Sequence, residues 1–292
     1  MDAQAFLLQL LTGLSRAAIL FIVAAGLSLV FGALRIVNVA HGSFFMVGAF
    51  VAATIMRSVE GLAGLLLAIV AAAAVVAALA TFVEVAVLRR LYASEHLLQL
   101  LGTFAFVLVF ADLVQFFWGA QPRRVVQPEP VGGSVAFGGI IFPKYSLFLI
   151  GVALLLALVL WALMTRTSLG RDIRAAVSDP EMLRMVGVDV SLLFTVVFAL
   201  GGALAAIGGV LVAPQSTARL GMDIDIIVES FAVVIIGGLG SLVGTAIGAL
   251  LVGLTFTFGI YFYPEAALGI VFVVLIAVLM WRPHGLYGVP ER

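Results

Sequence analysis

The apolar residues of this chain fall into eight long runs that are separated by short stretches of glycine, proline and charged residues. The runs lie near residues 6–34, 41–56, 61–88, 97–118, 146–164, 191–213, 226–260 and 265–281. Several reach the roughly 20 helical residues that cross a bilayer, and they lack the alternating polar and apolar positions of membrane β-barrel strands. The pattern predicts an all-α polytopic membrane protein with about eight or nine transmembrane helices, forming a single domain over residues 1–292.

Two breaks in the runs predict that some of these helices are discontinuous. The run 226–260 contains the sequence GGLGS at Gly237–Ser241, so it is either two short crossings or one crossing with a re-entrant half. A second break, at Asn38–Ser43, separates the first two runs. The Gly-Ser pairs at 42–43 and 240–241 each precede small residues on an apolar helix, an echo typical of membrane proteins with two related halves.

The composition supports the membrane assignment and excludes other classes. Hydrophobic residues make up 64% of the chain and charged residues 10%, which is too little polar surface for a water-soluble globule. The net charge is zero and the arginines are scattered, so a nucleic-acid partner is not expected. The absence of cysteine excludes disulfides and metal ligation by sulfur. Because the first run is too long for a cleaved signal peptide, we expect it to remain as the first helix.

Arginine and lysine predict the orientation, because they are enriched in cytoplasmic loops. With an external amino terminus and two crossings in 226–260, nine arginines lie inside: Arg35, Arg89, Arg90, Arg166, Arg171, Arg174, Arg184, Arg282 and Arg292. Five basic residues lie outside: Arg57, Arg123, Arg124, Lys144 and Arg219. Arg16 lies within the first helix and is expected to snorkel outward. The longest external loop is then 119–145, with a small hairpin around 135–142.

The cytoplasmic loop 165–190 contains a charged segment between two long apolar runs. Ser178 or Asp179 can cap a helix, Pro180 suits its first turn, Glu181 complements its positive end, and Gly187 stops it. We therefore predict a compact helix over 180–186. Its apolar residues are spread around much of its surface, so it can fill a groove in another protein or lie on lipid as an ordinary interfacial helix.

Three stretches together resemble one family: GLSLVFGALRIVNVAHGSFFMVGAF at 26–50, LGRDIRAAVSDPEMLRMVGVD at 169–189, and GGLGSLVGTAIGALLVG at 237–253. The chain looks like the LivH-type permease subunit of branched-chain amino acid ABC importers. The resemblance implies a multi-pass protein of the bacterial inner (cytoplasmic) membrane. It also implies partners: a second related permease, two ABC ATPase subunits inside, and an extracytoplasmic substrate-binding protein.

In this family, a cytoplasmic helix docks into a cleft of the ATPase, and Glu181 followed by Gly187 resembles the pattern of that loop. Met182 and Leu183 stand where the loop usually has two alanines. The residues that the resemblance assigns to coupling with the ATPase are Arg171, Arg174, Asp179, Pro180, Glu181, Arg184 and Gly187.

Polar and glycine residues at membrane depth are the candidates for a translocation pathway or gate, since polar groups in the bilayer tend to face protein or water. They are Asn38, His41, Gly42, Ser43, Glu229, Gly237, Gly238, Gly240 and Ser241. Each has a structural alternative: a buried polar staple or inner loop for the first four, an interfacial position for Glu229, and close helix packing for the glycines. Glu84, near Arg89 and Arg90, is interpreted as structural.

The sequence gives little support to catalysis, a cofactor or a metal site. No G-x-x-x-x-G-K-[ST] motif occurs and the sole lysine, Lys144, is in the external loop, so we expect energy from a partner or an ion gradient. His41 with Ser43, His96 and His284 form no recognisable catalytic set. The family resemblance implies inward transport of branched-chain or related amino acids by alternating access, driven by partner ATPases. A urea or short-chain amide permease, and a stand-alone channel or ion-coupled carrier, remain alternatives, and the identity of the second permease stays open.

Overall fold

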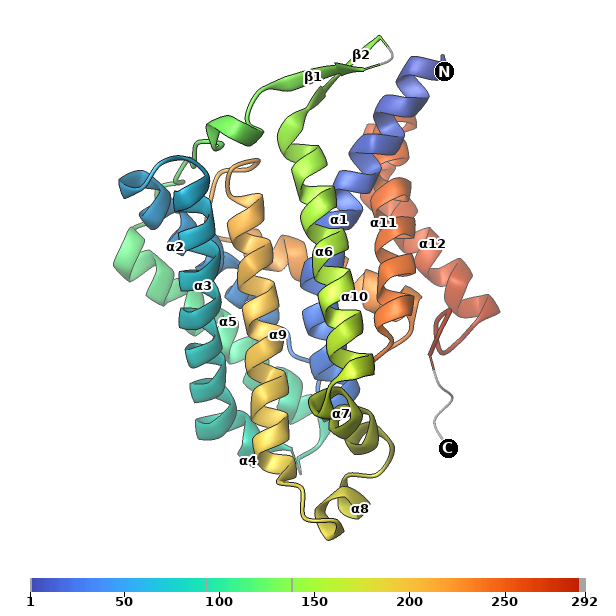
Figure 1. The fold of residues 1–292 in the computed structure, drawn as a ribbon. Coiled ribbons are helices and arrows are strands. Elements are labelled where there is room, and N and C mark those ends of the chain that lie inside the picture. The colour runs from blue at the N-terminus through green and yellow to red at the C-terminus, as the bar shows by residue number, and fades with distance from the viewer. Residues whose placement is uncertain (1, 93, 138, 289–292) are drawn as a thin grey trace.

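The computed structural model describes residues 2–92, 94–137 and 139–288, which form an elongated bundle of helices (Figure 1). The longer helices are α1 (Ala3–Leu34), α2 (His41–Ser58), α3 (Gly61–Val83), α5 (His96–Trp118), α6 (Lys144–Arg166), α9 (Val190–Val212), α10 (Met222–Gly237), α11 (Leu242–Phe262) and α12 (Ala267–Trp281). The shorter ones are α4 (Arg89–Leu91), α7 (Ser168–Ser178), α8 (Pro180–Met185), the π-helical turn η1 (Glu84–Leu88), and the 3-10 turns η2 (Glu129–Val131) and η3 (Pro264–Ala266).

Seven helices in the described part of the chain are long and apolar enough to cross a membrane. They are α1, α3 with its continuation to Leu91, α5, α6, α9, α11, and α12 with the turn before it. This confirms the predicted class, an all-α polytopic membrane protein. The two remaining long elements, α2 with 18 residues and α10 with 16, are not among these seven.

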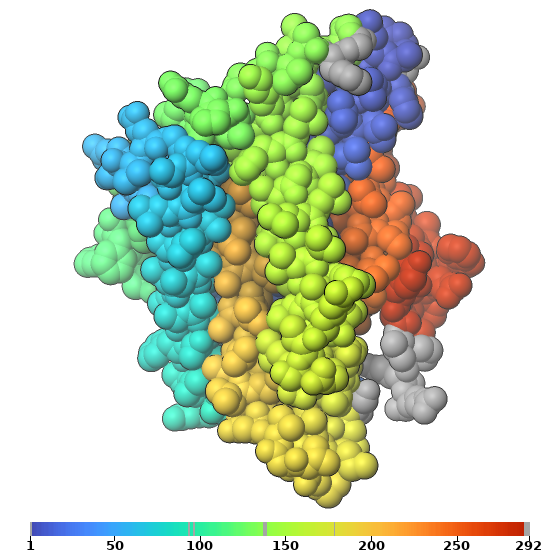
Figure 2. All heavy atoms as spheres, in the orientation of Figure 1, coloured from blue at the N-terminus to red at the C-terminus, as the bar shows by residue number. Residues whose placement is uncertain are grey.

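The core of the bundle lies around α1, α2 and α9, whose side chains are mostly buried. In contrast, α6, which lies at the front of the molecule in yellow-green in Figure 2, has exposed large apolar side chains, among them Leu154, Leu155 and Leu158. An exposed apolar surface of this length is stable in an apolar environment and not in water, so this face of α6 is suited to the interior of a membrane.

The helix α2 begins deep inside the bundle and not at its end. After α1, the chain reverses at Arg35, which has a left-handed backbone (φ 54), and then runs back beside α1 to His41. Nε2 of His41 lies 3.0 Å from the carbonyl oxygen of Val23. Val23 precedes Leu34, the last residue of α1, by about three helical turns, or roughly 16 Å along the axis. The start of α2 is therefore at mid-height of the bundle.

The helix α10 begins at the same place and runs the opposite way. Its first turn follows Gly221, and the carboxylate of Asp223 accepts a hydrogen bond of 3.2 Å from the Ser43 hydroxyl near the start of α2. At its other end, the turn after α10 brings Gly240 against Gly32 in the last turn of α1. The run 226–260 is thus two helices, α10 and α11, parted at residues 238–241, and the first of them starts at Met222.

Close contact between α2 and α9 depends on glycine. A Cβ added to Gly48 of α2 would overlap the carbonyl oxygen of Ala206 in α9, and one added to Gly209 would overlap that of Phe45. Small residues of this kind let two helix backbones approach in a membrane, where packing replaces the hydrophobic effect. The pair of glycines fixes α2 against the long helix that follows α8.

The two ends of the bundle differ. At one end lie the amino terminus and the antiparallel hairpin β1 (Ser134–Phe137) and β2 (Ile140–Pro143), with Val135 opposite Phe142 (Figure 1). This confirms the hairpin predicted around 135–142. At the other end, α7 and α8 form the tip of the molecule.

Candidate transport site and coupling segment

The predicted helix after Ser178 exists as α8 and is capped at both ends. The Asp179 carboxylate accepts hydrogen bonds from the backbone N–H groups of Glu181 (3.0 Å) and Met182 (2.9 Å), and Pro180 occupies the first turn. At the other end, Gly187 has a φ of 87° and donates to the Arg184 carbonyl. With the bond from Val188 to Leu183, this is a Schellman motif. The helix ends at Met185, one residue before the predicted end.

The apolar residues of α8 divide into an inward and an outward set. Leu183 is buried in a small core with Ile173 and Val190. Met185 is 77% exposed, and Met182 and Val186 are also exposed. The tip of the molecule therefore presents an apolar patch of Met182, Met185 and Val186, which we call the α8 patch.

The helix α7, which precedes α8, was not predicted as a separate element. Thr167 caps it by accepting a hydrogen bond from the Gly170 N–H (3.1 Å), and Ile173 and Ala176 face the small core. The spacing of these apolar residues was the available signal, because positions three and four apart share one face of a helix.

The charged candidates on α7 and α8 have different surroundings. Arg174 donates to the Met164 carbonyl at the end of α6, whereas the side chains of Arg171 and Arg184 are exposed. Arg35, after α1, donates to the Val177 carbonyl (3.2 Å) and so ties α1 to α7. The segment is thus attached to α1, α6 and α9, and the proposed coupling residues remain a prediction.

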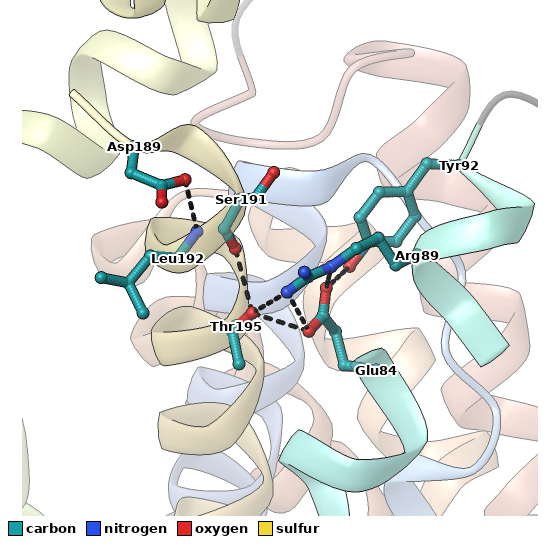
Figure 3. A network of polar contacts seen from close by, with 7 residues as sticks. All are labelled: Glu84, Arg89, Tyr92, Asp189, Ser191, Leu192 and Thr195. Carbon is teal, nitrogen blue, oxygen red and sulfur yellow. Dashed lines mark hydrogen bonds and ion pairs between the residues drawn. The ribbon is translucent and has the colours of Figure 1, made fainter. Parts of the chain in front are cut away.

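A buried polar network joins the beginning of α9 to the end of α3 (Figure 3). Glu84 is 0% exposed and accepts four hydrogen bonds. Arg89 donates to both carboxylate oxygens (3.2 and 3.1 Å), the Tyr92 hydroxyl donates to one and the Thr195 hydroxyl to the other (2.7 Å each). Burial, with the hydrogen bond to Glu84, raises the pKa of Tyr92 well above its usual range, so the phenol remains a donor. This arrangement accords with the structural role predicted for Glu84.

This network lies close to α8 along the chain. Asp189 caps α9 through a hydrogen bond of 3.0 Å from the Leu192 N–H, and Thr195 lies one turn further on. A displacement of α7 and α8 would therefore reach α9 through Asp189, and then α3 through Thr195 and Glu84. The network provides a rigid connection because each carboxylate oxygen is held by two donors.

The predicted residues of the first break come together at the meeting point of α2 and α10. Asn38, His41 and Ser43 are fully buried, and a Cβ on Gly42 would overlap the backbone of Asp223. Both polar side-chain atoms of Asn38 and Nδ1 of His41 have no hydrogen-bond partner within the described residues. Buried polar atoms are usually paired with protein or with ordered water, so these atoms make the site polar inside an apolar bundle.

Glu229 lies apart from this group and forms an ion pair that the sequence did not indicate. One carboxylate oxygen accepts a hydrogen bond of 2.6 Å from Arg16 of α1, and the guanidinium of Arg16 stacks on Phe256 of α11, 3.6 Å from the ring centre. Arg16 does not extend outward as expected, because the partly buried carboxylate of Glu229 on α10 and the Phe256 ring on α11 hold its guanidinium inside the bundle.

The second group of glycine candidates shapes the turn between α10 and α11. Gly237 packs directly on the Gly244 backbone, Gly238 and Gly240 have φ values of 103° and 81°, and Ser241 caps α11 through the Gly244 N–H (3.1 Å). These contacts support the structural alternative of close packing. A place for these residues in the pathway stays a prediction.

The end of the bundle opposite to α8 has a surface hollow of about 860 Å³. Charged side chains of both signs line it, among them Arg57, Glu60, Arg123, Arg124 and Glu129.

The long apolar helices, the two short helices that meet inside them and the anchored segment at one end define a multi-pass membrane transport protein. The chain belongs to the family described as "Branched-chain amino acid transport system / permease component", whose profile matches residues 9–279. It is therefore a permease subunit of an ABC importer and not an enzyme. A permease of this kind works with ATPase and substrate-binding partners.

Three curated relatives are similar over nearly their whole length. The chain is 28% identical to the high-affinity branched-chain amino acid transport system permease protein BraD of Pseudomonas aeruginosa, covering 98% of this chain and 97% of that one. It is 27% identical to LivH of Escherichia coli K12, covering 98% and 96%. It is 28% identical to the probable LivH of Methanocaldococcus jannaschii, covering 93% and 89%. No solved structure matches the chain.

Proposed function

We propose that this chain carries branched-chain or related amino acids inward across a bacterial cytoplasmic membrane. It does so as one of two related permeases, with two ATPases inside and a substrate-binding protein outside. The relatives named above are described as branched-chain amino acid permeases, and they align with 93% to 98% of this chain. The hollow at the end opposite to α8, with its charged lining, is the place where the binding protein docks.

In this proposal, the chain crosses the membrane nine times and its amino terminus is outside. Seven crossings are the long apolar helices. The other two are made by α2 and α10, each completed by the non-helical segment that leads to it. Support comes from the arginines near the α8 end, among them Arg35, Arg89 and Arg166, because basic residues are enriched on the cytoplasmic side.

The proposed mechanism is alternating access driven by the ATPases through α8. The observation that carries it is the α8 patch, an exposed apolar surface on a short helix. Asp179 caps the beginning of this helix and Gly187 caps its end. A rigid helix with exposed methionines suits insertion into an apolar groove of a partner. Movement of α8 then passes to α9, and the inner meeting point of α2 and α10 is the element that rearranges.

Co-purification of the ATPases with the permease tests this proposal. Met185→Asp places a charge in the α8 patch without touching the small core, so we expect loss of the ATPases while the permease itself stays folded. Val126→Asp, which charges an exposed apolar position in the external loop, is the matched control and should retain them. Retention of the ATPases by Met185→Asp would contradict the coupling role. Uptake by this chain alone in liposomes would replace the proposal with a channel or carrier.

A further inference from the structure

Two ion pairs lie on the surface of α1 and α10 that faces away from the bundle, between the two ends of the long helices. Besides Arg16 with Glu229, Arg219 and Asp225 form a pair of 2.5 Å at the start of α10. The side chains of Arg219 and Asp225 are 53% and 62% exposed, and that of Arg16 is 32% exposed.

Contacts with neighbouring helices give the depth of these charges. Gly13 and Ala17, which flank Arg16 on α1, pack against Gly253 in the middle of α11. The start of α10 is at the level of Ser43, inside the bundle. Both pairs therefore lie well inside the two ends of the long helices.

The exposed charges make this surface unsuited to contact with lipid. Exposed charges are unfavourable in hydrocarbon and are found where side chains face protein or a water-filled path. The exposed face of α6, with Leu154 and Leu158, has the opposite character. The outer side of α10 carries Ile224 and Val228, both exposed, next to the charges Asp225 and Glu229. We call these four residues, together with Arg16, the α10 face.

The α10 face complements an amino acid in charge and polarity. Arg16 has a guanidinium whose Nε has no partner within the described residues, and Glu229 is held by Arg16 alone among the hydrogen bonds of that part of the chain. The carboxylate of a zwitterion can accept hydrogen bonds from the arginine, and its ammonium can donate to the glutamate. Hydrogen bonds between ionised groups are stronger than those between neutral groups. Ile224 and Val228 offer an apolar surface to an aliphatic side chain.

We propose that the α10 face is one wall of the translocation path, and that Arg16 and Glu229 separate to bind the carboxylate and the ammonium of the passing amino acid. This inference rests on the proposed function and adds its specificity-determining residues. In the absence of substrate the two side chains neutralise each other, so neither attracts small ions of opposite charge into the path. The requirement for both charges on one molecule selects zwitterions against amines and acids of the same shape.

The first test measures whether water reaches the α10 face. The chain has no cysteine, so Val228→Cys gives one thiol on α10 while the ion pair stays intact, and Leu158→Cys gives a matched thiol on α6. In the assembled transporter, a cationic, membrane-impermeant methanethiosulfonate reagent should modify Cys at 228 at least tenfold faster than Cys at 158. Equal and slow modification of both would overturn the inference.

The second test measures leucine uptake and ATP hydrolysis by the complete transporter in proteoliposomes. Arg16→Gln with Glu229→Gln removes both charges and leaves a polar amide at each position, and the glutamine at 229 has the shape of the original side chain. We expect uptake to fall at least tenfold while hydrolysis stimulated by the binding protein stays within twofold. The matched control is Arg90→Gln with Glu95→Gln, which removes two exposed charges elsewhere and should change neither leucine uptake nor ATP hydrolysis. Uptake within twofold of the unmodified transporter by the neutral pair would overturn the inference.

Failure of the proposed function gives a different result. In that case the unmodified transporter takes up no leucine, whatever the modification rate at 228. An unmodified transporter that imports leucine, together with an unreactive α10 face, would retain the function and reject the assigned residues.

Discussion

The buried carboxylate of Glu84 gives the sharpest prediction about stability. Glu84→Gln preserves the shape of the side chain but replaces one acceptor oxygen by an NH₂ group. Either orientation of the amide turns this group toward an N–H of Arg89, because Arg89 donates to both oxygens. The hydroxyls of Tyr92 and Thr195 can rotate to accept, whereas arginine cannot. Loss of one charge-assisted bond costs about 1.5–3 kcal/mol, so we expect the free energy of unfolding to fall by about 2–3 kcal/mol.

The assay is unfolding of the purified chain in detergent, followed for the single and double variants. Thr195→Val removes one of the four bonds and should cost about 1 kcal/mol. Because both residues belong to one network, the double variant should cost less than the sum, with a coupling energy of at least about 0.5 kcal/mol. Glu95→Gln, at an exposed position, is the matched control. Equal stability of Glu84→Gln and this control, or strict additivity with Thr195→Val, would refute the reasoning.

Three further substitutions test the packing and the ends of α8. Gly48→Ala forces α2 away from Ala206 of α9 and should lower the free energy of unfolding by about 1–3 kcal/mol, whereas Gly151→Ala, which has open space around it, should be neutral or stabilising; equal effects would contradict the contact. Asp179→Ala should cost the first turn of α8 about 1 kcal/mol, seen as faster amide exchange there, and unchanged exchange would argue against the cap. Gly187→Ala strains a left-handed position by about 1–2 kcal/mol and should reduce ATPase co-purification; full retention would show that the end of α8 is unimportant for docking.

Features with local signals could be predicted from the sequence. The long apolar runs predicted the helices, and the stretch 135–142 predicted the hairpin, because these elements depend on residues close together in the chain. The helix α8 was predicted nearly to the residue, since Asp179 and Gly187 act through backbone groups within four positions of themselves. The sequence of α7 also has apolar residues three positions apart, Ile173 and Ala176, and this spacing could have predicted the helix.

Features that depend on distant partners could not be predicted. Arg16 and Glu229 are far apart in the sequence, and neither has a local reason to pair with the other. Thr195 similarly reaches Glu84 only because α9 packs beside α3, where Gly202 of α9 lies against Ala80. The Gly-Ser echo connected the start of α2 with the start of α11, whereas the start of α2 lies beside the start of α10, where Asp223 bonds to Ser43.

The most direct measurement is the accessibility of position 185 from the two sides of the membrane. Met185→Cys places a single thiol in the α8 patch, at a position that is 77% exposed. In membranes without the ATPases, a membrane-impermeant maleimide should label it in inside-out vesicles and not in right-side-out vesicles, and co-expressed ATPases should block the labelling. Labelling from the external side, or no protection by the ATPases, would contradict the account of how this permease is driven.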